Sequence, residues 1–308
     1  MNMRILVLGA GGVGGYFGGR LAEKGEDVTF LVRSSRKQHL EKHGLVIHSI
    51  HGDMRVKPQL ITAAEPASSF DLILFSTKAY HLEDAINDVK PFVGENTVVL
   101  PLLNGMAHIH RLQQELGKEK VIGGLCFIET TLNDGGEIIQ TSPMHRVVFG
   151  EMEERSSDRI SRIAELLSGT KASFVLSEQI EQDMWHKYLF ITTLSGLTTL
   201  MRSPVGPIRD LEGGRALFLQ LLEETANIMS AHGAPIREDI VEEHLNTIVK
   251  MTYNMKSSMQ RDMEKGTAVE AGHIPGFLLK LAEQYSIKAP LLTIIYQNLL
   301  VYESVQHS

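Results

Sequence analysis

Residues 5–14 read Ile-Leu-Val-Leu-Gly-Ala-Gly-Gly-Val-Gly, and this stretch decides the fold of the first half of the chain. The apolar run 4–8 predicts a short strand that ends in glycines. Helical character follows over 14–24, and residues 28–32 predict a second strand. A strand, a turn, a helix and a second strand in about thirty residues indicate a βαβ unit.

The glycines of this stretch match the pattern G-x-G-x-x-G of a dinucleotide site. We expect Gly9 to make the tight turn, Gly11 to let the backbone approach a pyrophosphate, and Gly14 to allow close packing of helix on strand. The helix N-terminus would present N–H groups and partial positive charge to the phosphates. Because the motif follows a predicted strand and opens a helix, it favours cofactor binding over a purely structural turn.

The residues after the second predicted strand distinguish NAD from NADP. NAD sites place a carboxylate there to hold the ribose hydroxyls, but this strand is followed by Arg33, with 34–37 reading Ser-Ser-Arg-Lys. A guanidinium binds a 2′-phosphate through charge-assisted hydrogen bonds, whereas a carboxylate would repel it. The sequence therefore predicts NADP (NADPH), and the alternative is a solvated cationic loop.

The two halves of the chain differ in their secondary-structure pattern. After a polar loop, the continuous apolar runs 70–76 and 97–103 predict strands, and a fully apolar stretch such as 72–75 is typical of a parallel sheet covered on both faces. Further strands are predicted at 121–131, 137–140, 146–149 and 173–176, with turns at 133–136 and 141–143. Helices are predicted at 179–201, 213–232, 238–265 and 276–285. We therefore predict an α/β chain, with a Rossmann-type doubly wound NADP-binding domain at 1–177 and an all-helical catalytic and substrate domain at 178–308.

Composition excludes several classes of protein. The 308 residues are 43% apolar, and the net charge of -7 offers no basic footprint for nucleic acid. The start of the chain has no signal-peptide pattern and the longest uncharged stretch of the second half is too short for a membrane span, so we expect a cytoplasmic protein with no membrane partner. The single cysteine, Cys126, lies in an apolar run and predicts a buried, inert thiol. Histidine pairs lack a completing ligand set, so we expect no metal.

Several ordered motifs over essentially the whole chain resemble the ketopantoate reductase (2-dehydropantoate 2-reductase) family. Beside residues 5–14, the resemblance rests on Ser76-Thr77-Lys78, Leu103-Asn104-Gly105-Met106, Trp185-His186-Lys187, and residues 257–262 followed by Glu270 and 274–278. Members of this family reduce ketopantoate to pantoate with NADPH, in the route to pantothenate and coenzyme A. The resemblance implies a small 2-oxo acid substrate.

The resemblance also implies roles for single residues. Lys187 matches the general acid, Glu270 matches the glutamate that contacts the substrate and supports the lysine, and Ser258 matches the serine at the substrate carboxylate. Asn104 matches an asparagine between cofactor and substrate, and Lys78 matches a lysine beside the nicotinamide. The expected cofactor contacts are thus Gly9, Ala10, Gly11, Gly12, Val13, Gly14, Arg33, Lys78 and Asn104; the expected substrate contacts are Asn104, Ser258 and Ser195.

The chain departs from the family pattern on the helix that carries Lys187. Four and eight residues further on, where the family usually has asparagine, stand Ile191 and Ser195. All three residues share one helical stripe. Ile191 cannot hydrogen-bond a substrate and Ser195 reaches less far, so a reductase for a different small 2-oxo acid is an alternative. A second alternative is an NADP-binding regulatory protein without catalysis.

The chemistry of a ketone reduction requires a proton donor near the substrate oxygen. Residues 188–194 are too apolar for a surface helix, so Lys187 is expected to be partly buried. Burial lowers the pKa of an ammonium group and a nearby Glu270 would raise it, and the sequence leaves that balance open. The helical half can support a homodimer, but no stripe in it separates a subunit interface from an internal core.

Overall fold

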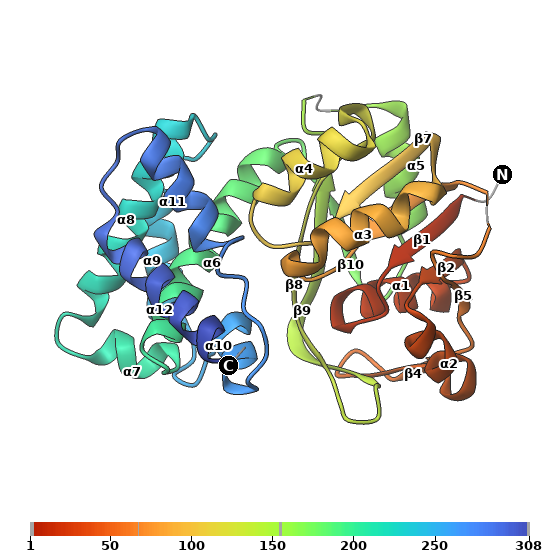
Figure 1. Ribbon diagram of the computed structural model, residues 1–308, viewed down its shortest axis with the longest axis horizontal. Coiled ribbons are helices and arrows are strands. Elements are labelled where there is room, and N and C mark those ends of the chain that lie inside the picture. The colour runs from red at the N-terminus through yellow and green to blue at the C-terminus, as the bar shows by residue number, and fades with distance from the viewer. Residues whose placement is uncertain (1–2, 67, 154–155, 307–308) are drawn as a thin grey trace. The chain divides into compact units, whose positions relative to one another are not determined.

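The computed structural model describes residues 3–66, 68–153 and 156–306 of the chain (Figure 1). The fold divides into two compact units. The N-terminal unit comprises Met1–Leu103 and His108–Ile180, and the C-terminal unit comprises Asn104–Ala107 and Glu181–Ser308. The assignment of cofactor binding to residues 1–177 and of catalysis to residues 178–308 stays a prediction. Asn104 belongs to the C-terminal unit, together with Lys187.

A five-stranded parallel sheet forms the centre of the N-terminal unit. Its strand order is β5-β2-β1-β6-β7, with β1 at Arg4–Leu8, β2 at Asp27–Leu31, β5 at Gln59–Ile61, β6 at Phe70–Phe75 and β7 at Val93–Pro101. The chain runs outward from β1 to β2 and β5, and then returns to the other side of β1 for β6 and β7. This reversal of strand order beside β1 is the predicted Rossmann-type arrangement.

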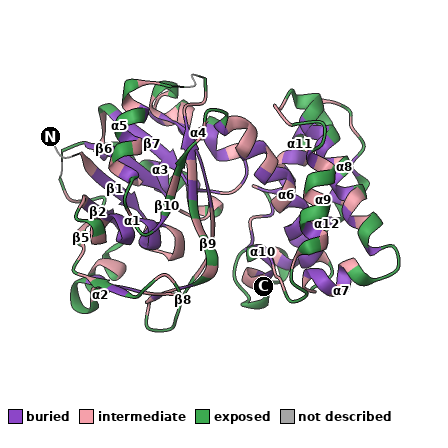
Figure 2. Cartoon of the chain, turned by 180° about the vertical axis from the view of Figure 1, so that it is seen from behind, coloured by how far each residue is buried: buried purple, intermediate pink, exposed green. Residues whose placement is uncertain are grey.

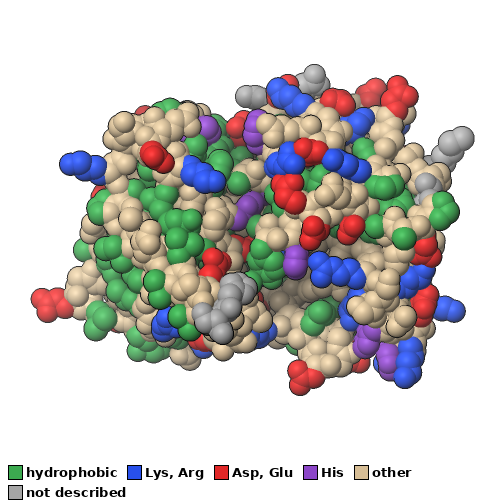
Figure 3. Space-filling model, viewed as in Figure 1, with side chains coloured by type: hydrophobic (Ala, Val, Ile, Leu, Met, Phe, Trp, Pro, Cys, Tyr) green, Lys and Arg blue, Asp and Glu red, His purple; other side chains and the backbone are tan. Residues whose placement is uncertain are grey.

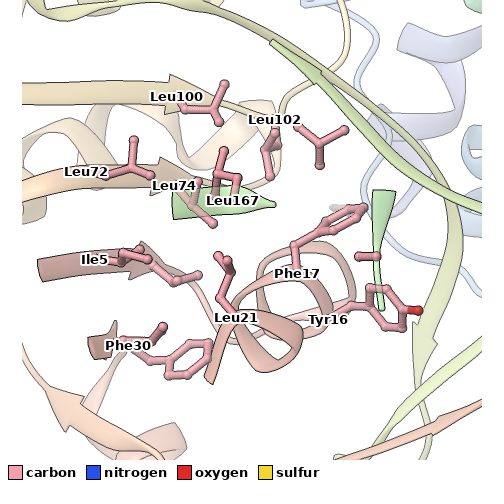
Figure 4. Packing of buried hydrophobic residues seen from close by; sticks show 14 of the residues in the cluster. Ile5, Tyr16, Phe17, Leu21, Phe30, Leu72, Leu74, Leu100, Leu102 and Leu167 are labelled. Atoms are coloured by element: carbon pink, nitrogen blue, oxygen red, sulfur yellow. The ribbon is translucent and has the colours of Figure 1, made fainter. Parts of the chain in front are cut away.

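Both faces of this sheet are covered, because successive side chains of a strand point to opposite faces. Ile5 and Val7 of β1 pack with helix α1 (Gly12–Lys24) in one core cluster, where Phe17 and Leu21 point toward the strands (Figure 4). Leu6 and Leu8 belong to a second cluster with α3 (Leu82–Val89) and α4 (Ala107–Leu116). The central strands are accordingly buried along their length (Figure 2).

A second, mixed sheet completes the N-terminal unit. Its order is β10-β9-β3-β4, with β8 paired antiparallel to β9; the bounds are β3 Leu45–Ser49, β4 Met54–Val56, β8 Gly123–Leu132, β9 Ile138–Gly150 and β10 Ser173–Leu176. Helix α5 covers Asp158–Leu167, and three short 3-10 helices cover Ala79–His81, Lys90–Phe92 and Lys118–Lys120.

Two sequence predictions for this unit are wrong. The expected polar loop before residue 70 contains α2 (Ser34–His43) and the strands β3, β4 and β5. Leu40 is the buried residue of α2, so this helix has no apolar period to detect. The expected turn at 141–143 is a bulge within the continuous strand β9, because the pairing passes from Ile128↔His145 to Thr130↔Gln140.

The C-terminal unit is helical, as predicted. Its helices are α6 (Ile180–Leu200, whose first residue lies in the other unit), α7 (Val205–Asp210), α8 (Gly214–His232), α9 (Ile240–Lys250), α10 (Ser258–Glu264), α11 (Pro275–Gln284) and α12 (Pro290–Gln306). The single helix predicted at 238–265 is wrong. Its helical pattern is broken after Lys250, and α10 starts anew because the Ser257 hydroxyl caps it by accepting from Gln260 N (3.1 Å).

Two surface properties bear on function. No helix in the described part of the chain is both long and apolar enough to cross a membrane. Acidic and basic side chains are interspersed over the face drawn in Figure 3.

Candidate active site

The glycine turn has the geometry that the motif predicts. Gly9 has φ +90°, and a Cβ there would lie 2.6 Å from the Ser76 carbonyl oxygen. A Cβ on Gly14 would lie 2.3 Å from the Gly9 carbonyl oxygen, so the helix start packs directly on the turn. Gly12 faces Thr130, whose Oγ1 would be 2.6 Å from an added Cβ. Gly9 and Gly14 would bring an added Cβ against backbone atoms, so packing alone requires glycine at these two positions.

Gly11 differs, because nothing lies within 4 Å of the position that its Cβ would take. It is the N-cap of α1, and no side chain caps that helix end. The first N–H groups of a helix have no partner within the helix. The open space at Gly11 and these donors fit a phosphate-bearing cofactor.

A cavity of about 750 Å³ lies beside this turn, within the N-terminal unit. Its lining brings together several predicted residues, namely Gly9, Ala10, Gly11, Arg33 and Lys78. Val13 is not among its lining residues but belongs to the first turn of α1. The carboxyl ends of β1, β2 and β6 converge on this cavity, which is where doubly wound folds bind ligands.

Two arginines stand at the end of β2. Arg33 is exposed and forms the N-cap of α2, with no side-chain capping bond. Arg36 is half-buried and donates to the carbonyl oxygens of Ala10 (3.0 Å) and Gly136 (2.9 Å). Burial lowers the pKa of Arg36. The sequence predicts no separate role for Arg36, but its guanidinium links the glycine turn to the turn between β8 and β9.

The acidic wall of the cavity is a feature that the sequence prediction missed. Asp84 and Asp88 of α3 line it together with His81. The pair Asp84 and Asp88 shares one face of α3 because residues four apart are neighbours on a helix. Carboxylates at this wall would repel a phosphate group, whereas the helix N-terminus at the glycine turn would attract one.

The second group of predicted residues lies in the C-terminal unit, around Lys187. Lys187 is 9% exposed, as the apolar character of α6 predicts. Its Nζ donates to Asn104 Oδ1 at 2.9 Å. An ammonium has only donors, so the amide oxygen is the atom of Asn104 that faces it. The contact joins two predicted residues that lie 83 positions apart in the sequence.

A turn between α10 and α11 carries Glu270 and an additional residue, His273. Val269 and Ala271 are buried, which anchors the turn on both sides of the half-buried Glu270. His273 Nε2 lies 2.7 Å from the Asn104 carbonyl oxygen. Burial lowers the pKa of His273, while the charge of Glu270 and the bond to Asn104 act in the opposite direction. Sequence reasoning quoted the residues around His273 but assigned it no role.

The remaining predicted residues take different positions. Ser258 is exposed as the first residue of α10, directly after the buried cap Ser257, whose Oγ contacts Thr198 Oγ1 at 2.9 Å. Ser195 is buried on α6 and Ile191 is half-buried. The substrate-binding roles of Ser258 and Ser195 stay predictions.

Two further predictions concern metals and thiols. Within the ranges that the structure describes, no group of three or more His, Cys, Asp and Glu side chains is arranged to hold a metal ion. Cys126 is buried, as predicted, and its Sγ lies 3.7 Å from the Leu102 carbonyl oxygen.

The fold and the glycine-turn cavity define a Rossmann-type dinucleotide-binding protein with a helical C-terminal unit. Residues 5–154 match the family model Ketopantoate reductase PanE/ApbA, and residues 179–303 match the model of its C-terminal part. The chain belongs to the ketopantoate reductase family.

Individual relatives extend over the full length of the chain. It is 47% identical over 302 residues to a Bacillus subtilis protein named uncharacterized oxidoreductase YkpB, covering 98% of this chain and 99% of that protein. It is 24% identical over 303 residues to a 2-dehydropantoate 2-reductase of Pyrococcus horikoshii, covering 98% of each. The solved 2-dehydropantoate 2-reductase from Geobacter metallireducens superposes with a TM-score of 0.88 at 27% identity, covering 97% of this chain and 99% of that one.

Proposed function

We propose that this protein is an NADPH-dependent reductase of a 2-oxo acid, and that 2-dehydropantoate (ketopantoate) is its substrate, with pantoate as product. The observation that carries the proposal is the buried ammonium of Lys187, held by Asn104, in a member of a reductase family. A carbonyl reduction needs such a proton donor, because negative charge develops on the substrate oxygen as hydride arrives.

The N-terminal unit supplies the cofactor site in this proposal. The N-terminus of α1 binds the pyrophosphate, and Gly11 leaves room for its approach. Arg33, with the uncapped N-terminus of α2, binds the 2′-phosphate, which favours NADPH over NADH. A reduced nicotinamide bound here supplies the hydride, and Lys78 lines the cavity at the end of β6.

The C-terminal unit supplies the acid–base groups. Lys187 Nζ donates a proton to the ketone oxygen, which becomes the hydroxyl of the product. Asn104 Oδ1 accepts from the same ammonium and so directs it. Glu270 supports the charge of Lys187, and the hydroxyl of Ser258 binds the substrate carboxylate. These roles follow the family resemblance position by position.

One structural feature favours a specific alternative substrate, a different small 2-oxo acid. Ile191 is half-buried on α6, one turn beyond Lys187, and adds an apolar surface where the family usually has an amide. A site with that amide can hydrogen-bond a substrate hydroxyl and so prefers hydroxylated substrates. A site without the amide has less of this preference. This observation favours 2-oxo acids with apolar side chains as the competing substrates.

The direct test is NADPH oxidation with purified protein and a panel of 2-oxo acids that includes ketopantoate, pyruvate and 2-oxoisovalerate. We expect the highest kcat/KM with ketopantoate. A higher kcat/KM with an apolar 2-oxo acid would replace the substrate and keep the reaction class. NADPH binding without turnover of any member of the panel would instead favour a regulatory protein.

A homodimer and a cytoplasmic location stay predictions.

A further inference from the structure

We propose that His273 is a positioning residue, which holds the Asn104 backbone so that the Asn104 side chain directs the ammonium of Lys187. The inference rests on the proposed reductase function for its kinetic consequence, but its structural content stands on contacts within the C-terminal unit. His273 touches Asn104 through the backbone, and Lys187 touches Asn104 through the side chain.

The hydrogen bond between the two residues runs from His273 to Asn104. His273 Nε2 lies 2.7 Å from the carbonyl oxygen of Asn104. A carbonyl oxygen only accepts, so Nε2 carries the hydrogen and donates it. Burial lowers the pKa of His273, while the charge of Glu270 and the bond to Asn104 raise it. Whatever the charge of the ring, the bond to Asn104 requires a hydrogen on Nε2.

The turn that carries His273 is itself anchored to α6. Tyr188, the neighbour of Lys187 on α6, donates through its hydroxyl to the Ile274 carbonyl oxygen at 2.5 Å. Ile274 N in turn donates to the Glu270 carbonyl oxygen at 3.0 Å. The turn that bears both Glu270 and His273 is thus fixed to the helix that bears Lys187.

These contacts close a ring. It runs from Lys187 to Asn104, from Asn104 to His273, along the chain to Ile274, and back to Tyr188. The ring begins at Lys187 and ends at Tyr188, which are adjacent residues of α6. A displacement of Asn104 must therefore stretch at least one of these hydrogen bonds. A closed ring of contacts restricts the position of the Lys187 ammonium. A proton donor must be held in a defined position relative to its substrate.

The His273 ring packs against the Asn104-Gly105 backbone. Gly105 has φ +80°, a left-handed conformation that favours glycine. A Cβ there would lie 3.4 Å from Cδ2 and Nε2 of the His273 ring, which is ordinary van der Waals distance, so the ring lies directly beside this turn. The left-handed turn at Gly105 therefore fixes the backbone next to the carbonyl that His273 binds.

The test uses His273→Phe, which keeps a ring and removes the donor, and His273→Gln, whose amide can donate in its place. We expect His273→Phe to lower kcat with ketopantoate by about 10- to 100-fold, with a smaller change in KM. His273→Gln should recover kcat to within about threefold of wild type. His232→Phe, at an exposed histidine of α8, is the matched control. Equal kcat for His273→Phe and wild type, or equal loss in the Phe and Gln variants, would overturn the inference.

Two measurements decide the inference without turnover, so that its failure is distinct from a failure of the proposed function. Brief acetylation with acetic anhydride, read by mass spectrometry, should modify Lys187 about fivefold faster in His273→Phe than in wild type, with the exposed Lys280 as internal reference. Nitrogen NMR of the wild-type protein should show a hydrogen on His273 Nε2. An unchanged Lys187 rate in a folded His273→Phe protein, or a bare Nε2 in the wild type, would contradict the proposal.

Discussion

Lys187 Nζ donates a hydrogen bond of 2.9 Å to Asn104 Oδ1, although 83 positions separate the two residues in the sequence. Both residues are predicted by the family resemblance, but their contact is a property of the folded C-terminal unit. Because the amide oxygen of Asn104 accepts a hydrogen bond from the buried ammonium of Lys187, we expect the effects of the two side chains on catalysis to be coupled.

A double-mutant cycle tests that coupling. Lys187→Met keeps the buried volume and removes the proton donor, so kcat/KM should fall by about 100-fold or more. Asn104→Ala should lower it by a smaller factor, and the double variant should match Lys187→Met to within about threefold. Lys280→Met, an exposed lysine of α11, serves as the control. Strictly additive losses would mean that the two residues act independently.

Arg33 is expected to determine the preference for NADPH. Arg33→Ala removes a charge-assisted contact worth about 1.5–3 kcal/mol, so the Kd of NADPH should rise by about 10- to 100-fold. The Kd of NADH should change little, because NADH has no 2′-phosphate. Fluorescence titration of both cofactors measures this, with Arg55→Ala, an exposed arginine of β4, as the matched variant. A parallel loss of affinity for both cofactors would remove Arg33 from this role.

Two glycines of the same motif should respond differently to alanine. At Gly14 the added methyl collides with the Gly9 carbonyl, and such overpacking costs about 1–3 kcal/mol of unfolding free energy. At Gly11 the methyl enters open space beside the cavity, so the Tm should stay near the wild-type value while NADPH affinity falls by about tenfold or more. Thermal unfolding and cofactor titration of both variants provide the comparison. A large loss of Tm in Gly11→Ala would show that this glycine is structural.

His186 should make the protein less stable in acid. Burial, aided by the charge of Arg237, lowers its pKa from 6.5 to about 4. The folded pKa is the lower one, so the unfolded chain binds more protons between these values, and the unfolding free energy falls as pH falls from 6.5 to about 4. His186→Gln, whose amide oxygen can still accept from Arg237 N, should reduce this slope. Urea unfolding at several pH values measures it, and an unchanged slope would contradict the assignment.

Much of the N-terminal site was open to prediction because it is local. Its parts lie close together in sequence: the strand, the glycine turn, the start of α1 and Arg33. Their spacing is sufficient to indicate a dinucleotide-binding motif. The second sheet was not foreseen, because β3 pairs with β9 across roughly ninety residues and α2 buries little. The positions of Asp84 and Asp88 could not be predicted, because nothing in the sequence of their own segment indicates that α3 lines the cavity.

The two-part organisation, the dinucleotide motif and the family can be predicted from the order of the residues, because glycine spacing and hydrophobic runs act over short stretches. Two contacts become visible only in the folded chain, the bond of Arg36 to the glycine turn and the bond of His273 to the Asn104 carbonyl. Those contacts depend on the distance between atoms of remote segments. A hydrogen bond forms only within a few tenths of an ångström, a tolerance that packing of the whole unit provides and that no local pattern records.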